Sequence, residues 1–164
     1  LTKEANAIRK LDQATHDDWQ AMLRLGERQL SPKLDPDSVS FIDIRDLEQQ
    51  EWSLIHHYQI PYTTPAQRQE QGIETVKQQA LDFARQFDAL YVSFDVDSLD
   101  AALVPGTGTP VPNGLSWQEA EQLLEAVCAL PQTKALEVTE INPLKDHANQ
   151  MAGHINQILS NVIR

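Results

Sequence analysis

Three carboxylates follow directly on an apolar run near the middle of the chain. Residues 89–100 read Ala-Leu-Tyr-Val-Ser-Phe-Asp-Val-Asp-Ser-Leu-Asp, and their aromatic and β-branched members are typical of a buried strand. Because side chains two apart on a strand share a face, we expect Asp95 and Asp97 to point the same way. Closely spaced carboxylates repel one another unless a cation neutralises them. A divalent metal site is therefore the simple explanation of this pair, and solvated caps or turns are the alternative.

Helices and strands are expected to alternate around this stretch. Apolar spacing, caps and turn residues predict helices over 2–30, 48–58, 65–87, 116–130 and 146–163, and strands over 39–44, 89–97 and 135–143. Residues 101–114 are rich in Pro and Gly, which predicts a long loop of functional importance. The alternation predicts an α/β fold, in which a mainly parallel sheet carries helices on both faces.

Acidic residues stand at the expected carboxyl ends of all three strands. Glu48 follows the first strand, Asp95 and Asp97 end the second, and Glu140 lies near the end of the third. Parallel strands bring these ends to one edge of the sheet, which is where open α/β sheets bind ligands. We therefore expect the acidic side chains to gather at that edge.

Composition limits the possible partners. The 164 residues carry 24 acidic and 13 basic side chains, a formal net charge of -11, and the basic residues form no cluster. Nucleic acid and anionic membrane surfaces are thereby disfavoured, whereas cations and cationic substrates fit. No apolar run approaches the roughly 20 residues that cross a bilayer. The single Cys128 suits a reducing cytoplasm, where we expect the protein to work.

Three motifs in order resemble one enzyme family. They are Ser-Phe-Asp-Val-Asp-Ser-Leu-Asp at 93–100, Pro-Gly-Thr-Gly-Thr-Pro at 105–110 and Glu-Ile-Asn-Pro at 140–143. Together they resemble the signatures of the ureohydrolases, which include arginases, agmatinases and formimidoylglutamases. The resemblance implies a three-layer α/β/α sandwich with a mainly parallel sheet and two Mn²⁺ ions at its carboxyl edge.

The resemblance also implies roles for individual residues. Asp95 matches the carboxylate that bridges the two ions, and Asp97 matches a ligand of one of them. Glu140 matches the residue that pairs with the substrate guanidinium, and Thr109 matches a loop residue close to the reacting centre. Two metals lower the pKa of a bridging water, and the resulting hydroxide attacks the guanidinium carbon to release urea and an amine.

A further stretch helps to choose the substrate within the family. Residues 45–51, Arg-Asp-Leu-Glu-Gln-Gln-Glu, resemble the arginase pattern Arg-Asp-Val-Asp-Pro-Gly-Glu. Glu48 and Glu51 then match the acidic residues that recognise the α-amino group of the substrate in arginases. This favours L-arginine over the substrates of agmatinase and formimidoylglutamase. Glu51 has a second interpretation, because an acidic residue in the first turn of a helix is stabilised by the helix dipole.

Part of the family pattern is missing. The Gly-Gly-Asp-His and Asp-Ala-His-x-Asp motifs, which supply the other metal ligands, do not occur. We therefore expect residues 1–164 to form the carboxyl-terminal part of a single arginase-like domain, inactive when alone, within a homo-oligomer that the resemblance implies to be a trimer or hexamer. The alternative is a truncated, non-catalytic α/β module that acts through binding or assembly.

Overall fold

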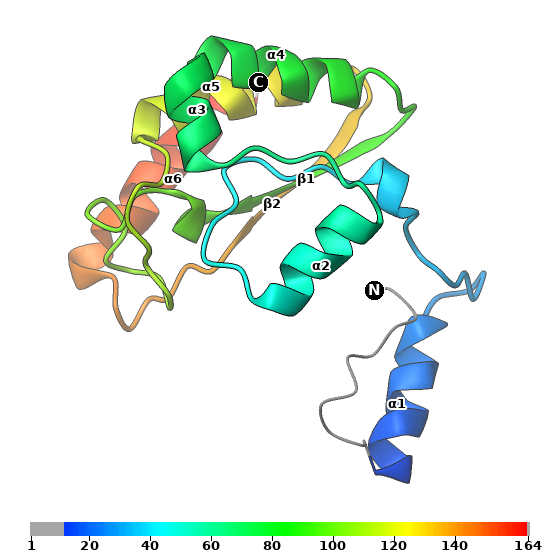
Figure 1. Ribbon diagram of the computed structural model, residues 1–164. Helices are drawn as coiled ribbons and strands as arrows, with labels where there is room; N and C mark the ends of the chain where they lie inside the picture. Colours follow the sequence, from blue (N-terminus) through cyan, green and yellow to red (C-terminus); the bar gives the residue numbers. More distant parts are fainter. Residues whose placement is uncertain (1–11, 164) are drawn as a thin grey trace. The chain divides into compact units, whose positions relative to one another are not determined.

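The computed structural model describes residues 12–163, which are drawn in colour in Figure 1. Their contacts divide them into two compact units. The first unit comprises residues 12–39 and 47–61, and the second comprises residues 40–46 and 62–163. None of the helices within the described range is long and apolar enough to cross a membrane. The sheet and the candidate site motifs belong to the second unit.

The first unit contains α1 (Gln13–Leu23), a 3-10 turn η1 (Pro36–Ser38) and α2 (Gln49–His57). Asp12 is the N-cap of α1, and its side chain accepts the Thr15 backbone N–H at 2.9 Å. This bond satisfies one of the free donors at the start of the helix. The helix predicted over 2–30 ends at Leu23 and not at residue 30. Residues 2–11 of that prediction lie outside the described range.

The second unit is built on two parallel strands joined through a helix. Strands β1 (Leu90–Asp95) and β2 (Thr133–Thr139) pair so that Phe94 faces Val138 and Asp95 faces Thr139. Helix α5 (Trp117–Cys128) lies between them in the sequence, so the three elements form one βαβ unit. The prediction of an α/β fold with a parallel sheet is confirmed.

Apolar side chains from strands, helices and loops share one core in this unit. Helices α4 (Ile73–Ala84), α5 and α6 (Gln150–Val162) contribute to it with β1 and the loop after it. Its buried members include Val76, Phe94, Val96, Leu99, Val104, Leu115, Leu123, Leu124, Met151, Ile155 and Ile158. On β1 the core takes Phe94, whereas Tyr91, on the opposite face, is 62% exposed. Asp95 shares the face of Tyr91, so it points away from this core.

Capping residues define several helix ends as predicted. Thr64 and Gln67 form a capping box at the start of α3 (Pro65–Gln71), and Ser116 and Glu119 form one at the start of α5. Asp146 accepts the backbone N–H groups of Met151 and Ala152, each at 2.9 Å, and so caps the first turn of α6. The 3-10 turn η3 (His147–Asn149) leads into that helix.

Two predicted elements are interrupted. The helix predicted over 65–87 is divided into α3 and α4 at Gly72, where the backbone adopts a φ of 81°. The strand predicted over 39–44 is wrong, since Phe41 makes only an isolated bridge to Tyr62. The physical reason is Asp43, whose φ of 61° takes the chain out of the extended conformation.

The central strand is also shorter than predicted. It ends at Asp95, and residues Val96–Ser98 form a 3-10 turn, η2. Asp97 therefore does not continue the strand, and the prediction that Asp95 and Asp97 share a strand face is wrong. The turn brings the two residues together by a different route, described below.

Gly72 provides a test of the break between α3 and α4. No atom lies within 4 Å of an added Cβ, so Gly72→Ala would act only through the positive φ. We expect the free energy of unfolding to fall by about 1 kcal/mol, measured by denaturant titration. Gly153→Ala is the matched control, because Gly153 lies inside α6 with open space at its Cβ. It should instead stabilise the protein, by up to about 1 kcal/mol, and a shared sign would contradict this explanation.

Candidate metal and substrate site

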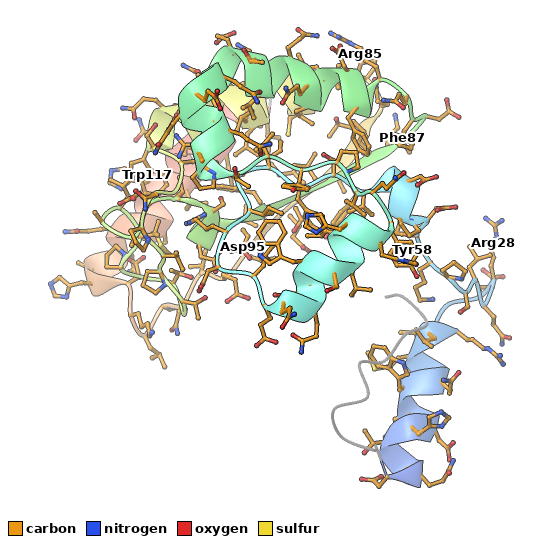
Figure 2. The ribbon with its side chains drawn as sticks, viewed as in Figure 1. Arg28, Tyr58, Arg85, Phe87, Asp95 and Trp117 are labelled. Carbon is orange, nitrogen blue, oxygen red and sulfur yellow. The ribbon has the colours of Figure 1, made fainter. Side chains whose placement is uncertain are left out.

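A tight turn at the end of β1 brings two carboxylates together. Asp95 Oδ1 accepts the backbone N–H of Asp97 at 3.0 Å, and the Ser98 hydroxyl donates to the carbonyl of Asp95 at 2.6 Å. Figure 2 shows Asp95 at this end of the strand. Both aspartates are half-buried. Such Asx turns are local alternatives to regular backbone pairing, and this one places Asp97 beside Asp95 instead of two positions further along a strand.

The Thr109 hydroxyl contributes a polar group from the loop after the turn. It donates to Asp97 Oδ2 at 3.1 Å, although Thr109 lies twelve positions further along the chain. The structure thus brings Thr109 into contact with a predicted metal ligand. A hydroxyl that donates to one carboxylate oxygen restrains the direction in which the other can face.

The loop containing Thr109 is tied to the segment after β2. The backbone N–H of Asn142 donates to the carbonyl of Gly106 at 2.8 Å, and Lys145 Nζ donates to the carbonyl of Gly108 at 3.0 Å. Gly106 leaves no room for a side chain, because an added Cβ would lie 2.7 Å from the Cβ of Asp146. The Pro-Gly-Thr-Gly-Thr-Pro loop therefore packs directly against the residues that follow Glu140.

Glu140 lies one residue beyond β2 with a left-handed backbone. Its φ is 63°, a conformation that is costly for a residue with a side chain. Its carboxylate is exposed and points towards the Gly108 region, where Oε2 would lie 3.8 Å from an added Cβ. The structure thus brings Glu140, Thr109, Asp97 and Asp95 into one neighbourhood.

The charges in this neighbourhood affect one another. The pKa of Asp95 is raised above its ordinary value, first because the side chain is partly desolvated and then because Asp97 and Glu140 carry like charges. The N–H of Asp97 opposes this effect by stabilising the carboxylate. A bound cation would relieve the repulsion, so the electrostatics favour positive charge at this point.

The donor set fits part of a site for a hard divalent cation. Carboxylate oxygens are ligands that Mn²⁺ and similar ions accept readily. Within residues 12–163, however, no three His, Cys, Asp or Glu side chains are arranged to hold an ion. Asp95 and Asp97 therefore supply some of the ligands that such an ion needs, and further ligands must complete its coordination.

Sequence reasoning missed the residue that holds the turn in place. The Arg45 guanidinium donates to the backbone carbonyls of Asp97 at 2.5 Å, Leu99 at 2.9 Å, Val111 at 3.1 Å and Ser98 at 3.2 Å. The sequence offered Arg45 only as the first residue of the Arg-Asp-Leu-Glu stretch, and nothing in the spacing indicated its partners. Contacts more than fifty positions apart are not visible in a local pattern.

A second arginine holds the end of the same loop. Arg68, on α3, is only 7% exposed and donates to the carbonyls of Asn113 at 3.1 Å and Gly114 at 3.0 Å. Its other donors meet two carboxylates, Asp43 Oδ1 at 2.8 Å and Glu119 Oε1 at 2.7 Å. Burial raises the pKa of Asp43, while the bond to Arg68 opposes that rise. Because the buried Asp43 Oδ1 accepts directly from Arg68, we assign Asp43 and Arg68 as an ion pair.

Glu48 and Glu51 have a structural role in the first unit. Glu51 Oε2 accepts the backbone N–H of Glu48 at 2.8 Å, and the two residues form a capping box at the start of α2. Both side chains are exposed. The helical interpretation of Glu51 is thus confirmed, and the substrate-binding role of the two residues stays a prediction.

Comparison with known proteins decides the family. The family model described as the Arginase family matches residues 21–163. The chain belongs to the arginase family. It is 33% identical over 119 residues to the arginase of Staphylococcus aureus, covering 71% of this chain and 39% of that protein. It is 32% identical over 116 residues to the mitochondrial arginase-2 of Mus musculus, covering 70% and 33%.

The fold is shared as well. The crystal structure of the Helicobacter pylori arginase superimposes with a TM-score of 0.80 at 29% identity, covering 94% of this chain and 51% of that one. The chain therefore has an arginase fold, present as part of a domain. The matched regions amount to between a third and two fifths of the two curated relatives above.

The pKa shifts at the turn predict opposite effects of two matched substitutions. The pKa of Asp95 is raised, so the folded state favours its protonated form, and stability falls as the pH rises through that pKa. Asp95→Asn removes this charge and keeps an acceptor for Asp97. In metal-free protein it should raise the melting temperature at pH 7, and the gain should vanish towards about pH 3, where both states are protonated.

Asp100→Asn is the control. Its carboxylate accepts the N–H groups of Ala102 at 2.9 Å and Asn113 at 2.7 Å, which lower the pKa of Asp100. An amide can accept only one of these bonds, so the melting temperature should fall at pH 7. The loss should shrink as the pH falls and the parent carboxylate becomes protonated. Equal signs for the two variants at pH 7 would overturn the electrostatic assignment of the turn.

Proposed function

We propose that the intact protein is a manganese-dependent hydrolase of a guanidino substrate, converting L-arginine to L-ornithine and urea. The observation that supports it most is the grouping of Asp95, Asp97 and Glu140 at the end of a parallel sheet, in a chain of the arginase family. The net charge of -11 is compatible with a cationic substrate. Because the chain matches only part of its relatives' length, the remaining ligands would come from outside residues 12–163.

Each residue of the site has a task in this proposal. Asp95 and Asp97 would hold the cations, and Thr109 would keep Asp97 in position through its bond to Oδ2. Glu140 would pair with the guanidinium, since a carboxylate matches the planar donors of that group. Metal ions bound here would supply the activation of a water for attack on the guanidinium carbon.

The stretch that contains Glu48 and Glu51 supports arginine as the substrate, because residues 45–51 resemble the arginase pattern. Glu48 and Glu51 would bind the α-ammonium group of arginine, and agmatine differs from arginine in lacking the α-carboxylate. The curated relatives from Staphylococcus aureus and Mus musculus are named arginases. Agmatine hydrolysis and formimidoylglutamate hydrolysis are the alternatives, and a non-catalytic α/β module is the alternative outside this enzyme class. We also propose a homo-oligomer, a trimer or hexamer, working in the cytoplasm.

Urea release by manganese-loaded intact protein tests the proposal. We expect urea from L-arginine and little from agmatine, whereas an agmatinase would give the opposite result and a formimidoylglutamase would give neither. Asp97→Ala should lose one manganese per subunit by elemental analysis, because it removes a ligand of one ion. An unchanged manganese content would reject the role of Asp97. Absence of urea from both substrates, together with absence of formamide from formimidoylglutamate, would favour the non-catalytic module.

Substitution of Glu51 separates its structural role from its proposed substrate role. Glu51→Gln keeps an oxygen for the capping box, as Gln67 does at the start of α3, but removes the negative charge. Loss of a charge-assisted bond should raise KM for arginine by roughly 10- to 100-fold. The small activity towards δ-guanidinovalerate should be unchanged, because this arginine analogue has no α-amino group.

The control makes the same charge change elsewhere. Glu74 lies in the first turn of α4 and pairs with Lys77 at 2.6 Å on the surface. Glu74→Gln should leave KM for both substrates unchanged. If Glu51→Gln alters arginine and δ-guanidinovalerate hydrolysis equally, Glu51 acts through the stability of α2 alone.

A further inference from the structure

Arg45 is bonded to an unusual number of backbone carbonyls around the Asp97 turn. Its two terminal nitrogens reach the carbonyls of Asp97, Ser98 and Leu99 in the turn and of Val111 in the following loop. A fifth, longer bond of 3.4 Å returns to the carbonyl of Asp43 on its own segment. Unlike Arg68, it meets no carboxylate in the described ion pairs. Its hydrogen bonds therefore go to backbone oxygens, while the carboxylates of Asp43 and Asp100 interact with its charge.

The chemistry of these contacts favours an arginine. The carbonyls come from two separate segments of the chain, and a planar guanidinium presents five N–H groups in a fixed fork that can meet several of them at once. A lysine ammonium is a compact charge with only three donors. Without Arg45, the carbonyls of Asp97 and Leu99 would each lose a donor, at a cost comparable to a lost hydrogen bond. The carbonyls of Ser98 and Val111 also accept backbone N–H groups, from Leu115 at 2.9 Å and Ala101 at 3.2 Å.

The clamp acts on the carboxylates of the site through the backbone. Asp97 is held on three sides: Arg45 binds its carbonyl, Asp95 Oδ1 accepts its N–H, and Thr109 donates to its carboxylate. The Val111 carbonyl, also bound by Arg45, lies two residues after Thr109. A single guanidinium therefore connects the backbone that carries Asp97 with the loop that carries its hydroxyl partner.

We infer that Arg45 is a positioning residue, which fixes the Asp97 carboxylate beside Asp95 so that the two can share a divalent cation. The cation part of this inference rests on the proposed function, and the positioning of the turn does not. Residues that orient metal ligands without touching the ion typically change metal affinity by about 10- to 100-fold when they are replaced.

The test compares Arg45→Met and Arg45→Lys with the intact parent protein in two measurements. Amide hydrogen exchange reports the order of the turn, through the N–H groups of Asp97, Leu99, Ala101 and Leu115. We expect exchange there to be faster by about tenfold or more in Arg45→Met, with the amides of β1 and β2 unchanged. Electron paramagnetic resonance of free Mn²⁺ reports affinity, which should fall by about 10- to 100-fold. Arg45→Lys should show the same pattern with smaller changes, and it serves if Arg45→Met does not fold.

Arg85→Met is the matched control, since it removes the same charge from an exposed side chain at the end of α4 (Figure 2). It should change neither measurement. Unchanged exchange around Asp97, or an equal acceleration of every amide, would overturn the positioning role. Faster exchange with unchanged Mn²⁺ affinity would overturn the link to the cation. A parent protein that binds no Mn²⁺ would overturn the proposed function and the cation part, while the exchange data would still decide whether Arg45 fixes the turn.

Discussion

The satisfaction of backbone carbonyls by two arginine side chains is the constraint on which the rest of this site depends. Between Val96 and Ser116 the chain forms neither a long helix nor a strand, so its carbonyls cannot pair in a regular ladder. Arg45 binds carbonyls at the start of this segment and the carbonyl of Val111, and Arg68 binds the carbonyls of Asn113 and Gly114 near its end. The segment therefore holds a defined path past Asp97 and Thr109 with little secondary structure of its own.

The two arginines are coupled through Asp43. Asp43 is 1% exposed, its side chain binds Arg68, and its carbonyl accepts a bond from Arg45. Glu119 completes the neutralisation of Arg68 while it also accepts from the N-cap Ser116. Removing one charged residue of this group would leave another buried charge without its partner. The free energy lost in that way is far larger than the stabilisation that any single contact in the group provides. This arrangement explains why residues 40–46 belong with the sheet although they form no strand.

Sequence reasoning recovered the features that depend on local chemistry. The capping residues, the parallel βαβ unit and the loop over 101–114 all follow from patterns within a few residues. The break at Gly72 was not predictable, because the apolar periodicity continues through it. A glycine within a helical pattern does not by itself indicate a positive φ. The absence of a strand at 39–44 has the same origin, since the apolar run gave no sign that Asp43 leaves the extended region.

The candidate site divides in the same way. Asp95, Asp97, Thr109 and Glu140 were identified from motifs, and the structure places them together. The means of their assembly was not predictable, because the turn replaces a strand continuation and the clamp comes from Arg45, far away in the sequence. The residue types of the site can thus be recognised from short motifs. The backbone contacts that orient these residues join positions far apart in the sequence and cannot be recognised in that way.

The left-handed backbone at Glu140 affects what a substitution there would report. A carboxylate-bearing side chain is unfavourable at a φ of 63°, whereas glycine adopts that conformation without a steric penalty. Seven other non-glycine residues of the described chain have a positive φ, among them Gln29, Gln59 and Ala148, so this conformation alone does not mark a residue that does chemistry. At Glu140, however, relief of the strain and loss of the carboxylate would come with the same replacement by glycine. Stability and any role of the carboxylate therefore oppose one another at this position.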